Sequence, residues 1–128
     1  MIKIEHVAIW STDIERLRIF YEKYFGARAN DRYFNPNKQL QTYFLRFREG
    51  ARLEIMQRPE VQNDRKATYQ AGYAHLAFSL GSKQKVDKLT RLLAEDGYPT
   101  LDGPRTTGDG YYESVVLDPD GNHIELTV

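Results

Sequence analysis

Residues 118–126, DPDGNHIEL, are the most informative about the fold, because part of this sequence has a counterpart earlier in the chain. The residues 118–121 carry the proline and the glycine of a tight turn. The spacing Gly-x-x-Ile-Glu that ends at Glu125 matches the spacing Gly-x-x-Leu-Glu that ends at Glu54. A repeated spacing of this kind predicts two copies of one structural unit.

Both copies show the same order of elements. His6 precedes Glu54 by nearly the same number of residues as His75 precedes Glu125. The first copy predicts strands at 2–10, 39–47 and 51–56, with a short strand and a turn around 33–37; the second predicts strands at 73–80, 111–117 and 123–128. Each first strand is followed by a helical pattern, which ends at Gly26 or at Gly97.

The helical patterns carry recognisable start signals and apolar faces. In the first, Thr12 with Glu15 forms a capping-box pattern, and in the second Ser82 is the expected cap. The expected buried faces are Ile14, Leu17, Tyr21, Tyr24 and Phe25 in the first helix and Val86, Leu89, Leu92 and Leu93 in the second.

These patterns predict an α+β fold with two βαβββ modules in tandem. We expect one domain over 1–128, with module 1 at about 1–58, a polar linker at about 59–71 and module 2 at about 72–128. The expected arrangement is a curved mixed sheet with a central cleft and the helices outside.

Composition excludes several classes of function. The 128 residues contain 18 Lys and Arg against 18 Asp and Glu, so the formal charge is zero and neither nucleic acid nor a membrane surface is expected as a partner. The chain has no cysteine, which excludes disulfides, thiolate catalysis and cysteine-ligated metals. The start of the chain lacks a signal-peptide pattern, and a cytoplasmic location is expected.

Four residues at matching positions of the two copies are candidate metal ligands. Each carboxylate stands between apolar neighbours, so strand alternation turns it away from the face that packs on the helix. Two imidazoles and two carboxylates suit a divalent metal such as zinc, nickel, manganese or iron. In the alternative interpretation these side chains are structural, with Glu54 paired to a nearby arginine. The four candidate ligands are His6, Glu54, His75 and Glu125.

The repeat resembles the vicinal oxygen chelate superfamily, which includes glyoxalase I, extradiol dioxygenases, methylmalonyl-CoA epimerase, and fosfomycin and bleomycin resistance proteins. The likeness covers nearly the whole chain and rests on four pieces of sequence: HVAI at 6–9, Phe20-Tyr21 before Gly26, AHLAF at 74–78 and the stretch 118–126. The order His, Glu, His, Glu is similar to that of glyoxalase I.

The resemblance implies a lyase or isomerase acting on a thiol hemithioacetal, or on another small substrate with vicinal oxygens. The metal would stabilise an enediolate and a glutamate would move the proton. The two candidates for this catalytic base are Glu125, favoured by analogy, and Glu54. An iron-dependent dioxygenase, a resistance transferase and a non-catalytic small-molecule-binding module remain alternatives. A homodimer is expected by the same analogy.

One position departs from the pattern of bacterial glyoxalase I. Trp10 stands where an arginine would help to hold glutathione, and an indole cannot pair with a carboxylate. The stretch 103–110 resembles the flexible substrate loop of the family, and Arg105 in it is the nearest candidate for an anion contact. Trp10, Arg105 and Tyr111 are therefore the predicted substrate-binding residues, and the thiol remains open.

Overall fold

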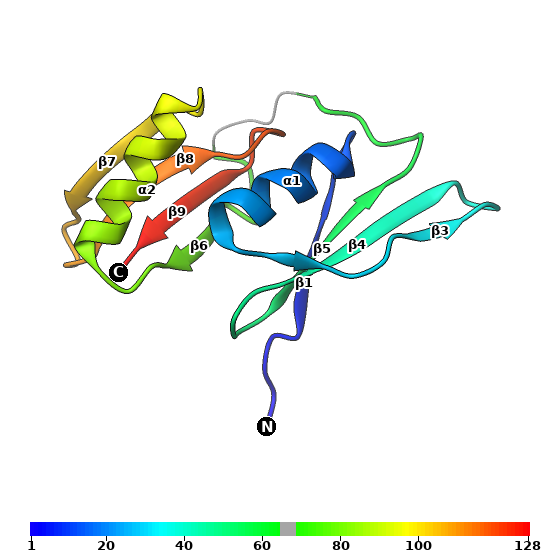
Figure 1. Cartoon of the computed structure of the whole chain (residues 1–128), viewed down its shortest axis with the longest axis horizontal. Helices are drawn as coiled ribbons and strands as arrows, with labels where there is room; N and C mark the ends of the chain where they lie inside the picture. Colours follow the sequence, from blue (N-terminus) through cyan, green and yellow to red (C-terminus); the bar gives the residue numbers. More distant parts are fainter. Residues whose placement is uncertain (65–68) are drawn as a thin grey trace. The chain divides into compact units, whose positions relative to one another are not determined.

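The computed structural model describes residues 1–64 and 69–128, which fall into two compact units that divide between Arg65 and Lys66 (Figure 1). We call them unit 1 and unit 2. The expected linker at 59–71 includes residues 65–68, which lie outside the described residues. Each unit has its own mixed sheet and one helix, so the predicted α+β fold with tandem modules is confirmed.

The two units repeat one topology. Unit 1 contains β1 (His6–Trp10), α1 (Ile14–Phe25), β2 (Arg28–Ala29), β3 (Tyr33–Asn35), β4 (Leu40–Arg46) and β5 (Arg52–Gln57). Unit 2 contains β6 (Leu76–Ser79), α2 (Lys83–Glu95), β7 (Thr100–Thr106), β8 (Tyr112–Leu117) and β9 (His123–Thr127). In each unit the first strand pairs in parallel with the last, giving the orders β1-β5-β4-β2, with β3 on β4, and β6-β9-β8-β7.

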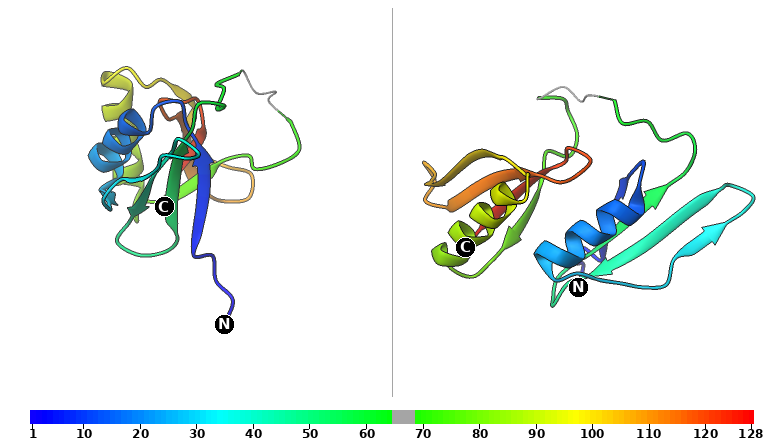
Figure 2. Two further views of the ribbon diagram at one scale, coloured as in Figure 1. Left: turned by 90° about the vertical axis from the view of Figure 1, so that its right-hand side faces the viewer. Right: turned by 45° about the horizontal axis from the view of Figure 1, so that its top comes forward.

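Helix α1 covers one face of the sheet in unit 1 (Figure 2). The predicted residues Ile14, Leu17 and Tyr21 are buried, and Phe20 joins them. The predicted cap at Thr12 is wrong, because the Oδ1 atom of Asp13 accepts the hydrogen bond from the backbone N–H of Arg16 at 3.0 Å. The helix ends at Gly26, as predicted, and the φ of 65° there is the left-handed conformation that glycine adopts without strain.

Helix α2 covers one face of the sheet in unit 2 (Figure 2). Ser82 caps it as predicted, since its Oγ accepts from the N–H of Lys85 at 3.2 Å. Val86 and Leu93 are buried as expected, but Leu92 is 40% exposed. The prediction that Leu92 is buried is wrong. Successive helical residues are about 100° apart, so a helix that buries Leu93 turns Leu92 outward. Neither described helix has the length and apolar character needed to cross a membrane.

Three predicted element boundaries differ from the structure by more than one residue. The strand expected at 2–10 begins only at His6, because its partner β5 begins at Arg52, directly opposite His6. The strand expected at 73–80 likewise begins at Leu76, opposite Ile124 of β9. The loop expected at 103–110 is partly strand, because residues 100–106 pair with β8 as β7.

Candidate metal centre

Unit 1 places the first predicted histidine and glutamate next to each other. His6 lies on β1 and Glu54 on the neighbouring strand β5, and the His6 Nε2 atom is 3.8 Å from the Glu54 Oε1 atom. Leu53 and Ile55, which flank Glu54, are buried, so alternation turns Glu54 to the face opposite α1. Its side chain is only 17% exposed. These two side chains form what we call half-site 1.

An arginine and an aromatic ring support half-site 1 without occupying it. Phe44 lies opposite Glu54 in the β4–β5 ladder. Its ring packs edge to face against the His6 ring, with 5.3 Å between the two ring centres. The Arg52 guanidinium lies 4.2 Å from the Phe44 ring centre and donates both of its short hydrogen bonds, at 2.5 and 2.8 Å, to Glu5. Those bonds lower the pKa of Glu5 to about 2. The hydrogen bonds of Arg52 therefore go to Glu5, although its charge also interacts with that of Glu54. The imidazole of His6 lies beside Glu54.

Unit 2 repeats the same pair. The His75 Nε2 atom lies 3.1 Å from the Glu125 Oε2 atom. Glu125 lies on β9 between the buried residues Ile124 and Leu126, so it faces away from α2, and its side chain is 23% exposed. His75 directly precedes β6 instead of lying within it. We call this pair half-site 2.

A third carboxylate, which the sequence did not suggest, lies beside half-site 2. Glu113 is on β8, two residues from Val115, which is directly opposite Glu125 in the ladder. It therefore shares the face of Glu125. Burial raises the pKa of Glu113, and a hydrogen bond with Glu125 raises it further. Its position could have been predicted from strand alternation, because Ser114 and Val116, which are both buried, place Glu113 on the opposite face of β8.

The predicted substrate-binding residues lie at exposed positions. Trp10 ends β1 and is 49% exposed, and Tyr111 precedes β8 and is 59% exposed. Arg105 lies on β7 opposite Glu113, and it donates hydrogen bonds to Asp102, the shortest at 2.9 Å. That pairing raises the pKa of Arg105.

The donor set of each unit fits half of a metal shell. Each half-site offers one imidazole nitrogen and one carboxylate oxygen, which are donors that zinc, nickel, manganese and iron accept. Within residues 1–64 and 69–128 no three or more His, Asp or Glu side chains are placed so that they could hold a metal ion together. A protein metal centre generally takes three or four protein ligands, so neither half-site is sufficient alone.

Comparison with known proteins gives consistent matches over the whole chain. This chain is 28% identical over 129 residues to the uncharacterized protein YqjT of Bacillus subtilis, with 96% of each chain covered. A possible glyoxalase from Bacillus cereus is 28% identical, with a TM-score of 0.75 and full coverage of both chains. The trypanothione-dependent glyoxalase I of Leishmania major shares the fold at 22% identity and a TM-score of 0.79, with 99% of this chain and 86% of that chain covered.

A family model matches residues 3–126, which is nearly the whole chain and includes both half-sites. The matching family is described as the glyoxalase, bleomycin resistance protein and dioxygenase superfamily. The match agrees with the tandem repeat of one βαβββ topology in the two units. The chain therefore belongs to the glyoxalase/bleomycin resistance protein/dioxygenase superfamily.

Proposed function

We propose that this protein is a metal-dependent lyase or isomerase of the glyoxalase I type, whose two half-sites together bind one divalent cation. The observation that carries the proposal is the recurrence of a histidine–glutamate pair, within 4 Å, on the corresponding strands or strand edge of both units. The similarity to a possible glyoxalase of Bacillus cereus supports the same class of activity. The proposed ligands are His6, Glu54, His75 and Glu125.

The burial of the two carboxylates supports a bound cation. Glu54 and Glu125 are about four-fifths buried, and a carboxylate taken out of water is costly unless a positive charge or several hydrogen bonds compensate it. The Arg52 charge acts on Glu54 while its hydrogen bonds go to Glu5, and Glu113 hydrogen-bonds to Glu125, so a cation would add to these partners. When bound, a divalent cation would act as a Lewis acid toward two adjacent oxygens of the substrate.

The reaction also needs a group that moves a proton between two neighbouring carbons. A carboxylate oxygen close to those carbons can take the proton from one and return it to the other. We assign this step to Glu125, with Glu54 as the second candidate. The histidines His6 and His75 would then act as metal ligands only.

We propose a thiol hemithioacetal, or another small molecule with vicinal oxygens, as the substrate. Trp10, Arg105 and Tyr111 remain the candidate substrate contacts. Arg105 already bonds to Asp102, so an anionic part of the substrate would have to compete with that carboxylate. Trp10 offers an apolar surface at the position where the resemblance leads us to expect an arginine. Both features favour a thiol cosubstrate other than glutathione.

The decisive experiment combines metal analysis with substitution. We expect Glu54→Gln and Glu125→Gln each to lose bound metal and hemithioacetal isomerase activity, measured by elemental analysis and by absorbance with several thiols. His123→Gln is the matched control, because His123 lies on the same strand as Glu125 but is exposed. Full metal retention in Glu54→Gln would indicate a three-ligand site. A three-ligand site, or iron as the native metal, would support the dioxygenase or transferase alternative. Native protein that contains no metal would favour a non-catalytic binding module.

A mixing experiment tests the proposed homodimer. If the centre joins unit 1 of one copy to unit 2 of its partner, a dimer of one Glu54→Gln chain and one Glu125→Gln chain contains one intact centre. We then expect mixing and reassembling equal amounts of the two inactive variants to restore about a quarter of the wild-type activity, because about half of the dimers are mixed and each mixed dimer has one intact centre out of two. No recovery in a mixed dimer verified by mass spectrometry indicates a centre built within each chain.

A further inference from the structure

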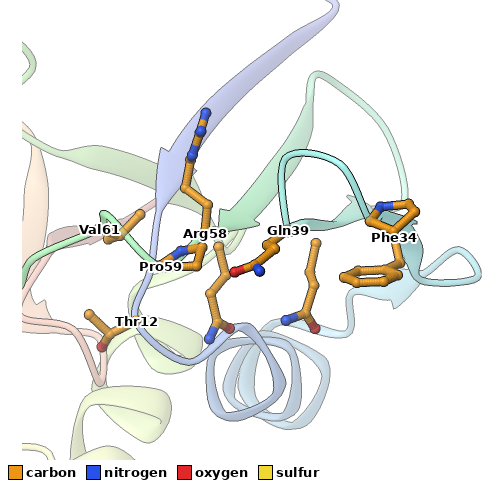
Figure 3. A pocket seen from close by; sticks show the side chains of 9 residues that line it. Thr12, Phe34, Gln39, Arg58, Pro59 and Val61 are labelled. Atoms are coloured by element: carbon orange, nitrogen blue, oxygen red, sulfur yellow. The ribbon is translucent and has the colours of Figure 1, made fainter.

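Unit 1 contains a pocket of about 470 Å³ that the proposed metal chemistry does not use (Figure 3). Its volume falls within the range of small-molecule sites, about 300–1,000 Å³. The lining combines three glutamines with apolar side chains. It comes from the β1–α1 connection, β3, the β3–β4 turn, β4, the end of β5 and the segment after it. The lining residues are Thr12, Phe34, Pro36, Gln39, Gln41, Gln57, Arg58, Pro59 and Val61.

Two lining glutamines face the side of the sheet opposite to half-site 1. Gln57 is two residues from the buried Ile55, and its Oε1 atom accepts the backbone N–H of Ile14 in α1 at 3.0 Å. Gln41 lies opposite Gln57 in the β4–β5 ladder and two residues from Tyr43, whose hydroxyl bonds to Glu15 of α1. By alternation, both glutamines are on the α1 side, whereas Glu54 is on the other. The pocket is therefore separate from half-site 1.

The hydrogen bonds that already exist decide what these glutamines can offer a ligand. The Gln57 carbonyl oxygen accepts from the N–H of Ile14, and the Gln41 carbonyl oxygen accepts from Nη1 of Arg32 at 3.0 Å. Both partners can only donate, so the orientation of each amide is fixed with its NH₂ group left over. The pocket thus presents mainly amide donors, and a ligand must supply acceptors.

The charges around the pocket do not favour an ionised ligand. Arg58 is the one ionisable residue in the lining. Its Nε atom donates to Glu60 Oε2 at 2.6 Å, and Figure 3 shows its side chain extending away from Gln39. That hydrogen bond also lowers the pKa of Glu60. An anion in the pocket would have to compete with the Glu60 carboxylate for the Arg58 charge, and a cation would find no carboxylate in the lining.

The walls suit a flat molecule. Figure 3 shows Gln39 between Pro59 on one side and Phe34 on the other. Phe34 is 50% exposed, so its ring is available for stacking, which is how aromatic side chains bind planar rings. Glutamine amides pair well with the hydrogen-bonding edge of a planar heterocycle.

From these hydrogen bonds, charges and pocket walls we infer that the pocket binds an uncharged planar heterocycle. The heterocycle stacks on Phe34 and accepts hydrogen bonds from Gln41 and Gln57. The ligand class is a neutral aromatic ring with ring nitrogens or an amide, of the kind found in nucleobases and nicotinamide. This site goes beyond the proposed isomerase activity and does not depend on it, since it lies on the other face of the unit 1 sheet.

The test uses nicotinamide and adenine as probes on the full-length, ¹⁵N-labelled protein. We expect saturable shifts of backbone amide signals at 34–41 and 57–61 in NMR titrations with at least one probe. Phe34→Ala and Gln41→Leu should each weaken binding roughly tenfold, the amount that loss of one stacking or hydrogen-bonding partner gives. Tyr33→Ala is the matched control: Tyr33 is the neighbour of Phe34 and similarly exposed, at 53%, but does not line the pocket.

Benzoate and the variant Glu54→Gln complete the test. Benzoate has the size of nicotinamide with a negative charge, and we expect it to bind at least about tenfold more weakly. Glu54→Gln should leave probe binding unchanged while it alters the metal centre, which separates failure of this inference from failure of the proposed function. The inference is overturned if neither probe binds saturably, if Phe34→Ala and Tyr33→Ala behave alike, or if benzoate binds as well as the neutral probes.

Discussion

A buried pair of hydroxyl groups joins α2 to β8 in unit 2, and its removal gives a prediction whose size follows from the structure. The Oγ1 atom of Thr90 donates to the backbone carbonyl of Val86 at 2.6 Å. The Thr90 proton is thereby committed, so the 2.7 Å contact between Thr90 and Ser114 must be a hydrogen bond donated by Ser114. Thr90 and Ser114 are 4% and 1% exposed, so water cannot replace either partner.

The two single substitutions should lower the free energy of unfolding by different amounts. Thr90→Val keeps the shape of the side chain but leaves the Ser114 hydroxyl buried with no acceptor, which costs about 1–3 kcal/mol of unfolding free energy. Ser114→Ala removes only the donor, because Thr90 keeps its bond to Val86, and should cost about 1 kcal/mol. The double variant removes both polar groups. Since replacing both partners by apolar groups can be nearly neutral, it should be more stable than Thr90→Val by about 1 kcal/mol.

Urea unfolding of the four proteins measures this cycle through the midpoints, provided the slope of free energy against urea stays constant. Ser79→Ala is the matched control, because Ser79 is an exposed serine on β6, and it should change stability by less than about 0.5 kcal/mol. A double variant whose loss equals the sum of the two single losses refutes the reasoning, as does a Thr90→Val variant with wild-type stability.

Two further predictions concern other parts of the chain. Gly103→Ala should lower the unfolding free energy by at least about 2 kcal/mol, because φ is 77° and a Cβ atom would lie 2.4 Å from the Glu113 carbonyl oxygen. Gly108→Ala is the control: its Cβ atom would meet open space and φ is outside the left-handed region, so the unfolding free energy should stay close to that of the wild type. Thermal unfolding compares the two variants. In the folded protein the pKa of Glu5 is about 2, against an ordinary value of 4.5. The Glu5–Arg52 pair therefore stabilises the fold fully above pH 4.5, and this stabilisation is lost as the pH falls toward 2. The stability of Glu5→Gln should therefore converge with that of wild type at low pH and in high salt, and a gap that widens on acidification contradicts this.

The repeat made the topology predictable from the sequence, but it did not set the strand lengths. The alternation at Ile2 and Ile4 is that of a strand, yet these side chains are 105% and 70% exposed. A strand extends only as far as its partner, and β5 begins at Arg52, opposite His6. The partner's first residue is a property of the tertiary pairing, which a local pattern does not contain.

The two half-sites were more accessible to prediction than their surroundings. Glu54 and Glu125 each stand between two buried hydrophobic residues, so alternation placed them directly. Glu113 was missed because Ser114, on the buried face of β8, looks like a polar surface residue in the sequence. Its hydroxyl is buried only because Thr90 of α2 accepts its hydrogen bond, and that partner lies on another element.

The glutamine pocket illustrates information that only the pairing of strands supplies. Glutamines in strands are normally interpreted as solvated side chains. Gln41 and Gln57 come together because the β4–β5 register places them directly opposite each other. Gln39 joins them at a φ of 52°, an uncommon conformation for a residue other than glycine.

The same pairing of strands explains why each half-site depends on closure of its own unit. In unit 1 the histidine comes from the first strand and the glutamate from the last, and the parallel β1–β5 ladder brings them together, with Ala8 opposite Glu54. In unit 2 the β6–β9 ladder places Ala77 opposite Glu125, and His75 directly precedes β6. A histidine and a glutamate distant in sequence can approach only when the intervening helix and strands have packed and the ladder has closed. Substitutions that weaken the core of one unit should therefore disturb its half-site even when they lie far from it, which makes the Thr90–Ser114 cycle a probe of half-site 2 as well as of stability.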